Sequence, residues 1–186
     1  MDSQNLTLST ATLGGGCFWC LDASFRQLAA VEDVISGYAG GSGGQPDYAS
    51  VCSGTSGHAE VVQVRFDSSK LNFGELLSIF FAIHDPTTLN RQGNDVGSQY
   101  RSVIFTHSAE QQAKALSLIA ELDAQEIWPT PIVTAVLSAP TFWPAEDYHQ
   151  NYFARNPTQG YCQAVVQPKV AKLRQRFSAA LRQISR

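Results

Sequence analysis

The chain has 186 residues, 44% of them hydrophobic, which fits one domain with a proper core. A net charge of −3 argues against electrostatic binding to nucleic acid or an anionic membrane. The first ten residues lack a basic start, and the longest apolar run, 76–83, is too short to span a bilayer. We therefore expect a cytoplasmic monomer, one domain over residues 1–186, whose four cysteines are reduced at rest.

The stretch GGGCFWC at 14–20 joins the first two predicted elements. Residues 6–13 alternate apolar and small polar side chains as in a strand, and residues 17–30 carry apolar side chains at helical spacing. Cys17 then lies in the first helical turn, where unpaired N–H groups and the helix dipole favour an anion. Such a position is one recognised way to lower the pKa of a cysteine below about 8.5.

Polar loops alternate with regular elements in the next part of the chain. The two long loops are residues 39–57, rich in glycine and serine, and residues 84–99. The regular elements are predicted strands at 31–38, 58–66 and 100–105, and a helix capped by Asn72 and Glu75 before its apolar residues 76–81.

The later segments are packed around a core formed by the first six elements. Those six run strand, helix, strand, strand, helix, strand, the order of the split β-α-β-β-α-β motif. We predict an α/β (α+β) fold: a two-layer sandwich with a ferredoxin-like core, a mixed sheet, additional helices and long loops. The later segments are helices at 108–124 and 145–154, a strand at 132–137, the segment 161–166, and a basic amphipathic helix at about 168–186, which we interpret as a solvated face.

Glu60 lies on the most regular predicted strand, 58–66. Alternation places it on the same face as Val62 and Val64. A carboxyl group on an apolar face is costly to ionise, so its pKa rises and it can donate a proton near neutrality. The alternative is a carboxylate at the strand end that faces solvent, and the pattern favours neither.

Cys17 and Cys20 have the CxxC spacing, which fits a dithiol redox pair, half of a zinc site, or small core residues. The zinc interpretation is weak because Cys52 and Cys162 are isolated in the sequence. The two aromatic residues between Cys17 and Cys20 are either helix core or an apolar wall for a small substrate, since aromatic rings make favourable contacts with sulfur.

Five stretches, in order and at similar separations, match those of one enzyme family. They are GGGCFWC at 14–20, YASVC at 48–52 leading into SGTSGHAEVV, HDPTTLNRQGNDVGSQYRS at 84–102, FWPAEDYHQNY at 142–152 and GYC at 160–162. On these stretches, which cover most of the chain, the sequence resembles the type A peptide methionine sulfoxide reductases.

The resemblance implies an oxidoreductase that reduces methionine-S-sulfoxide, free or in proteins, and so repairs oxidised proteins. It implies that Cys17 is the nucleophile and that Glu60 donates a proton to the sulfoxide oxygen. It also implies a set of substrate-binding residues: Phe18 and Trp19 around the methyl group, Tyr48 and Tyr100 at the oxygen, and Asp95 ordering the site.

The same resemblance implies how the enzyme is recycled. The sulfenic acid left on Cys17 would condense with a neighbouring thiol, and a thioredoxin-like dithiol would reduce the disulfide. Cys162 matches the usual resolving position, Cys20 competes with it from one helical turn away, and we favour Cys162 slightly. We expect no cofactor, metal, nucleic acid or membrane partner. A general thiol–disulfide oxidoreductase, which would need CxxC alone, is the rival function.

Overall fold

The structure is a computed structural model that describes residues 7–183. Its centre is a six-stranded mixed sheet with the strand order β7-β6-β1-β3-β2-β8. Neighbouring strands are antiparallel except for β6 and β7, which are parallel. The strands are β1 Leu8–Gly14, β2 Val31–Ala39, β3 Ala59–Asp67, β6 Val103–Thr106, β7 Ala135–Ser138 and β8 Trp143–Pro144.

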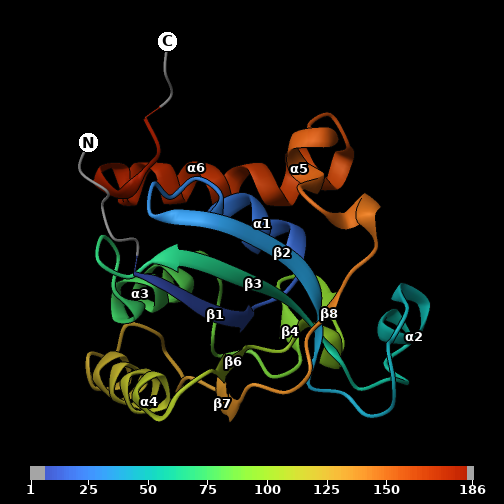
Figure 1. Ribbon diagram of the computed structural model, residues 1–186, viewed down its shortest axis with the longest axis horizontal. Helices are drawn as coiled ribbons and strands as arrows, with labels where there is room; N and C mark the ends of the chain where they lie inside the picture. The colour runs from blue at the N-terminus through green and yellow to red at the C-terminus, as the bar shows by residue number, and fades with distance from the viewer. Residues whose placement is uncertain (1–6, 184–186) are drawn as a thin grey trace.

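The helices differ greatly in length, and all of them contribute side chains to one large core against the sheet. In Figure 1, α1, α5 and α6 lie on one side of β2, whereas the short α2 stands apart from the other helices. None of the helices in the described part of the chain is long and apolar enough to cross a membrane. The helices are α1 Phe18–Phe25, α2 Tyr48–Cys52, α3 Phe73–Ile83, α4 Ala109–Ala124, α5 Tyr152–Arg155 and α6 Gln167–Arg176, and a π-helical turn Cys162–Val166 leads directly into α6.

The two faces of the sheet are covered differently, and β3 shows why. Val62, Val64 and Phe66 join the large core that α1, α3, α4 and α6 complete, whereas Ala59 and Val61 join a smaller cluster on the opposite face. Successive side chains of a strand point to opposite faces, and the second face of β3 is covered only at its start, since Gln63 is half-buried and Arg65 is exposed. The predicted grouping of Glu60 with Val62 and Val64 is therefore confirmed.

The mixed α/β fold is confirmed, but the helix predicted over 145–154 is wrong. A 3₁₀ turn Asp147–His149 and the separate helix α5 occupy this segment. Asn151, with a φ of 50°, interrupts the helical backbone between them. The predicted loop 39–57 also contains α2, whose first turn is closed by a capping box between Asp47 and Ser50.

Both helices near the ends of the sequence are shorter than predicted. The first, expected to reach residue 30, ends at Phe25, because residues 27–29 pair instead with residues 180–182 through backbone hydrogen bonds and a Leu28–Leu181 bridge. The basic helix, expected to continue to residue 186, ends at Arg176. Residue 6 of the first predicted strand and residues 184–186 lie outside the described residues.

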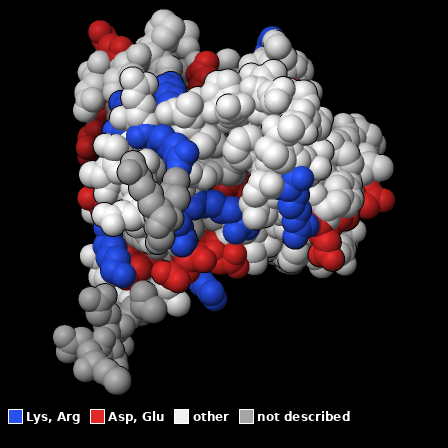
Figure 2. Space-filling model, turned by 90° about the horizontal axis from the view of Figure 1, so that it is seen from above, with Lys and Arg blue, Asp and Glu red and all other residues white. Residues whose placement is uncertain are grey.

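The basic side chains near the end of the chain do not form a uniform positive surface. Figure 2 shows the face that carries α6, where Lys and Arg side chains lie next to a band of Asp and Glu. The carboxylates in this band come from other elements, because α6 itself contains no acidic residue.

Gly16 shapes the turn that carries Cys17. Its φ of 93° lies in a region that side chains strongly disfavour, and a Cβ atom there would be 2.6 Å from Cγ of Gln92. The Gln92 amide is fixed by hydrogen bonds with the backbone N–H and carbonyl of Asp85. The short hairpin of β4 (Arg91–Gln92) and β5 (Asp95–Val96) therefore packs directly against this turn.

Replacing Gly16 by alanine should lower the free energy of unfolding in urea by more than the ~1–3 kcal/mol of backbone strain alone, because the methyl group also meets Gln92. Gly43→Ala is the matched control, since Gly43 has a φ of 95° but a Cβ there meets no atom within 4 Å. Equal destabilisation by the two substitutions would show that the contact with Gln92 is unimportant.

Candidate active site

A cavity of about 210 Å³ opens beside the amino-terminal end of α1. It brings together seven residues singled out in the sequence, which come from α1 and the residue before it, α2, β3, β5 and the 3₁₀ turn Ser98–Tyr100. Tyr161 is an eighth lining residue that sequence reasoning gave no role, although GYC marked its position. The lining residues are Cys17, Phe18, Trp19, Tyr48, Glu60, Asp95, Tyr100 and Tyr161.

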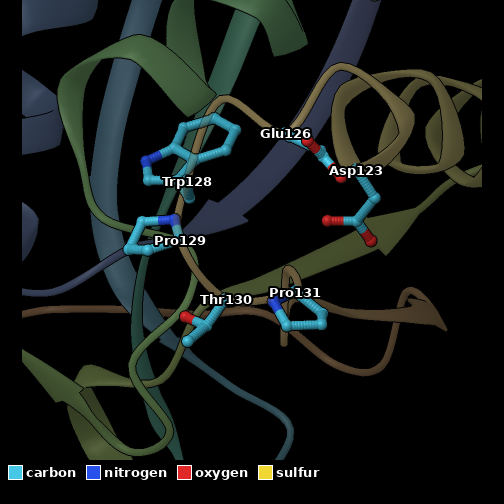
Figure 3. A pocket seen from close by; sticks show the side chains of 6 residues that line it. All are labelled: Asp123, Glu126, Trp128, Pro129, Thr130 and Pro131. Atoms are coloured by element: carbon cyan, nitrogen blue, oxygen red, sulfur yellow. The ribbon is translucent and has the colours of Figure 1, made fainter.

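Larger hollows elsewhere on the surface lack this chemistry. The hollow in Figure 3, about 530 Å³, lies at the end of α4 and carries two carboxylates opposite a tryptophan and two prolines, with no nucleophile among its lining residues. Another, of about 770 Å³, lies near the start of α3 and α4 and is lined mainly by polar side chains, with Glu110 and Lys114 as its charged residues. Within residues 7–183, no group of three or more His, Cys, Asp or Glu side chains is placed to hold a metal.

Cys17 is the residue immediately before α1 and is only 8% exposed. Burial raises the pKa of its thiol well above the ordinary value, and the hydrogen bond with the Cys20 thiol and the charge of Glu60 raise it further. The predicted lowering of this pKa by the helix end is therefore wrong for the free protein. The reason is that burial outweighs the backbone hydrogen bond from Trp19, which by itself lowers this pKa. The other N–H at this helix start, that of Phe18, donates to the Glu60 carboxyl group.

Glu60 is 2% exposed and points from β3 toward the start of α1. Its Oε2 accepts a hydrogen bond from the Phe18 N–H at 3.0 Å. Burial raises the pKa of Glu60 to about 8, although this hydrogen bond opposes the rise. The carboxyl group is thus mostly protonated at neutral pH, and the alternative of a solvent-facing carboxylate is wrong.

Three tyrosines supply neutral hydroxyl groups to the cavity. Tyr48 begins α2, Tyr100 ends the 3₁₀ turn Ser98–Tyr100, and the Tyr161 hydroxyl donates to Oδ2 of Asp95 at 2.7 Å. Burial raises the pKa of each of these tyrosines, so all three remain protonated donors across the physiological range. Asp95 is fixed by Tyr161 and stands on the hairpin that packs against the Cys17 turn.

The aromatic wall of the cavity is held by a buried histidine. Trp19 stacks on Tyr152 with ring centroids 3.8 Å apart, and its indole N–H donates to Nδ1 of His149 at 3.1 Å. That hydrogen bond fixes the tautomer, because Nδ1 must be unprotonated to accept it. His149 is 1% exposed and its ring lies 5.0 Å from that of Phe18 and 4.7 Å from that of Tyr48.

Glu146 connects this wall to the sheet. Its carboxylate accepts hydrogen bonds from the Tyr38 hydroxyl at 2.8 Å and from the Tyr48 backbone N–H at 3.0 Å. It also lies 3.7 Å from Nε2 of His149. The stretch FWPAEDYHQNY contains both Glu146 and His149, yet their contacts reach across the fold and no local pattern could assign them.

The remaining thiols differ in their surroundings. Cys20 and Cys162 are almost completely buried in the same core as Cys17, whereas Cys52 is half-buried on α2. All four are free thiols in this structure. The two candidate resolving cysteines therefore lie in the core and are not among the residues that line the cavity.

Comparison with known proteins identifies the family. The sequence model described as peptide methionine sulfoxide reductase matches residues 9–181. The chain belongs to this family. It is 57% identical to the peptide methionine sulfoxide reductase MsrA of Polynucleobacter asymbioticus over 97% of this chain and 95% of that protein. It is 58% identical to MsrA of Chromobacterium violaceum over 94% of this chain and 99% of that protein.

Solved structures agree with this assignment to the reductase family. Reduced Mxr1 from Saccharomyces cerevisiae has a TM-score of 0.78 and 34% identity, covering 87% of this chain and 92% of that chain. Mxr1 from Saccharomyces cerevisiae in complex with Trx2 has a TM-score of 0.56 and 26% identity, covering 82% of this chain and 89% of that chain. As a type A member, the chain is an oxidoreductase, a peptide-methionine (S)-S-oxide reductase, and its reaction is the reduction of methionine sulfoxide.

The raised pKa of Glu60 should make the stability of this reductase depend on pH. The Glu60 carboxyl group loses its proton near pH 4.5 in the unfolded chain and near pH 8 in the folded chain. The contribution of the protonated group to the free energy of unfolding is therefore complete below pH 4.5 and is lost as pH rises to about 8. The free energy of unfolding of the wild type relative to Glu60→Gln should fall across this window, by at most ~1.4 kcal/mol per pH unit.

Urea denaturation of both proteins between pH 4 and pH 9 measures this difference. Groups that titrate alike in the two proteins, such as Asp22 with a pKa of about 6, cancel in the comparison. Parallel pH profiles for the two proteins would show that Glu60 is ionised in the fold at neutral pH.

Proposed function

We propose that Cys17 attacks the sulfur of a methionine-S-sulfoxide, free or within a protein, while Glu60 protonates the oxygen. One observation carries this assignment: a thiol and a carboxyl group that both keep their protons line one small cavity with aromatic walls. The chain would act as a single reductase domain, and its redox equivalents would come from thiols, so it needs no metal or organic cofactor.

The walls of the cavity suit the end of an oxidised methionine side chain. Phe18 and Trp19 offer apolar ring surface to the S-methyl group, because aromatic rings contact sulfur groups favourably. Tyr48 and Tyr100 provide neutral hydroxyl donors for the sulfoxide oxygen, which carries partial negative charge. Asp95, fixed by Tyr161, would order this polar side of the site.

In the free site both Glu60 and Cys17 carry a proton, and these two protons determine how the reaction proceeds. A sulfoxide sulfur is electrophilic, but its oxygen cannot depart as a bare anion without a heavy cost. Glu60 gives its proton to this oxygen and regains one from the Cys17 thiol, so Cys17 attacks as a thiolate only when substrate is in place. Oxygen transfers to Cys17, which becomes a sulfenic acid, and the substrate leaves as methionine.

Recycling of the sulfenic acid needs a second thiol and an external dithiol. Condensation with a protein thiol releases water and forms a disulfide, which a dithiol then reduces by exchange. A thioredoxin-like protein is the proposed reductant. The relative Mxr1, whose structure is known in complex with Trx2, supports this choice of partner.

Cys17→Ser should abolish the formation of methionine from methionine-S-sulfoxide with dithiothreitol as reductant, because serine is a far poorer nucleophile at the same position. Cys52→Ser is the matched control, since Cys52 is not among the residues that line the cavity, and it should retain activity. Measurable turnover by Cys17→Ser would assign the chemistry to another residue.

Glu60→Gln should slow oxygen transfer by about 10²- to 10⁴-fold, the usual contribution of a positioned acid. Rapid-quench measurement of methionine formed in a single turnover gives the rate. Substrate binding, measured by calorimetry in a Cys17→Ser background to prevent turnover, should change only a few-fold, because the amide keeps the shape of the acid. A single-turnover rate equal to that of the wild type would remove Glu60 from the chemical step.

A further inference from the structure

We propose that His149 is a positioning residue that sets the width of the apolar end of the cavity, so that the cavity accepts an S-methyl group and disfavours longer S-alkyl groups. His149 is not among the residues that line the cavity, so it acts through Trp19 and does not touch the substrate. This inference rests on the proposed function, since it concerns the sulfoxide that would occupy the cavity.

Trp19 is the wall residue whose position the core determines least. Phe18, the other apolar wall, is 1% exposed, and its ring lies 5.7 Å from that of Tyr38 and 5.0 Å from that of His149. Trp19 is only half-buried and packs against the core from its edge. The width of the apolar end therefore depends mainly on where the Trp19 ring lies.

Two kinds of contact fix the Trp19 ring in different directions. Its stack on Tyr152, with an interplanar angle of 5°, sets the plane of the indole but lets the ring slide or turn within that plane. A hydrogen bond is directional. The indole N–H donates to Nδ1 of His149 at 3.1 Å and so fixes the ring within its plane. Loss of this acceptor would leave Trp19 held by ring contacts alone.

His149 can hold Trp19 because its own ring is firmly placed. The residue is 1% exposed, and its backbone N–H donates to the Glu146 carbonyl at 2.9 Å. Its ring lies 4.0 Å from that of Tyr148 and 4.7 Å from that of Tyr48. Burial lowers the pKa of His149, although the charge of Glu146 opposes this shift. Nδ1 is therefore unprotonated at neutral pH and can accept the indole N–H.

The other ring nitrogen indicates that packing alone does not explain a histidine at this position. With Nδ1 as the acceptor, the neutral ring carries its proton on Nε2. Nε2 is buried and has no hydrogen-bond partner within residues 7–183, since Oε2 of Glu146 is 3.7 Å away. A buried N–H without a partner is unfavourable, and an aliphatic side chain would avoid this cost. The bond to Trp19 is the contact that a hydrocarbon could not replace.

A fixed wall limits the size of the alkyl group on the sulfoxide sulfur. An S-ethyl group has one methylene more than an S-methyl group, and one methylene in an apolar pocket changes kcat/KM by roughly 10- to 200-fold. The cavity has a volume of about 210 Å³ and would also hold the sulfoxide oxygen beside Tyr48 and Tyr100. An ethyl group would therefore require Trp19 to move against its hydrogen bond with His149.

The test compares kcat/KM for methionine-S-sulfoxide with kcat/KM for the S epimer of ethionine sulfoxide, with dithiothreitol as reductant. The wild type should prefer the methyl substrate by at least about tenfold. His149→Leu, which fills the space but removes the acceptor, should reduce this preference to about twofold or less. His149→Asn, whose amide oxygen can take the position of Nδ1, should retain most of the wild-type preference.

Tyr148→Leu is the matched control for packing. It removes a ring that contacts His149 but takes no part in the hydrogen bond to Trp19. This variant should keep the wild-type preference for the methyl substrate. An equal loss of preference in Tyr148→Leu and His149→Leu would assign the effect to packing and overturn the proposal.

NMR spectra of the indole N–H groups report the hydrogen bond independently of activity. Trp19→Phe identifies the Trp19 signal among those of the three tryptophans. The Trp19 indole proton should resonate farther upfield in His149→Leu than in the wild type, and should stay near the wild-type position in His149→Asn. An unmoved Trp19 signal in His149→Leu, or an unchanged methyl preference, would overturn the proposal.

Failure of the proposed function would look different, because the wild type would then form no methionine from methionine-S-sulfoxide. A wild type that reduces both substrates equally well would contradict only the role of His149. The preference is a ratio measured on one sample, so it does not depend on the fraction of a variant that folds. Should His149→Leu yield no folded protein, His149→Gln decides the question. Its amide matches the position of Nε2 and not of Nδ1, so it should lose the preference.

Discussion

The hydrogen bond from the Phe18 N–H to the Glu60 carboxyl group joins the start of α1 to the middle of the sheet, and the rest of the site depends on it. Glu60 on β3 pairs with Tyr38 on β2, and the Tyr38 hydroxyl bonds to the Glu146 carboxylate. Glu146 in turn accepts the Tyr48 N–H at the start of α2. One continuous chain of contacts thus fixes the Cys17 turn, Glu60 and the isolated helix α2 relative to each other.

Desolvation, more than charge pairing, determines where the protons reside in this site. Among the residues lining the cavity there is no lysine, arginine or histidine that could stabilise a thiolate or a carboxylate. Two groups share the helix end, because the Phe18 N–H donates to the Glu60 carboxyl group while a backbone hydrogen bond from Trp19 lowers the pKa of Cys17 without offsetting burial. The free protein therefore keeps Cys17 in the thiol form, which is less prone to oxidation by other agents than a thiolate.

Local periodicity and capping signals were sufficient for much of the fold. The strand around Glu60 and the helices that begin after Asn72 and Ser108 are all observed near their predicted positions. The hairpin of β4 and β5 has strands of two residues each, too short for any periodic signal. The break at Asn151 depends on a single backbone conformation, which an uninterrupted helical pattern does not reveal.

Which residues form the site could be predicted from the sequence, but the direction of the pKa shift of Cys17 could not. Alternation placed Glu60 on an apolar face, while the positions of Tyr48, Asp95 and Tyr100 followed from family resemblance and not from any periodicity. The pKa of Cys17 was mispredicted because a helix-end argument is local, whereas burial in the folded chain has the largest effect and the charge of Glu60, 42 residues beyond Phe18 in sequence, adds to it. Tyr161 reaches Asp95 across 66 residues, a contact that only the folded chain shows.

The pairing of residues 180–182 with residues 27–29 closes the connection between α1 and β2 from outside. This pairing lies just after Phe25, the last residue of α1, at the end of the helix opposite to Cys17. The helix is therefore held at both ends, by Glu60 at its start and by residues 180–182 after its last residue. For anyone fusing a reporter or an affinity tag to this reductase, the boundary to respect is Arg182. A junction placed before Arg182 would remove part of the pairing with residues 27–29, so that α1 would be held only at its start.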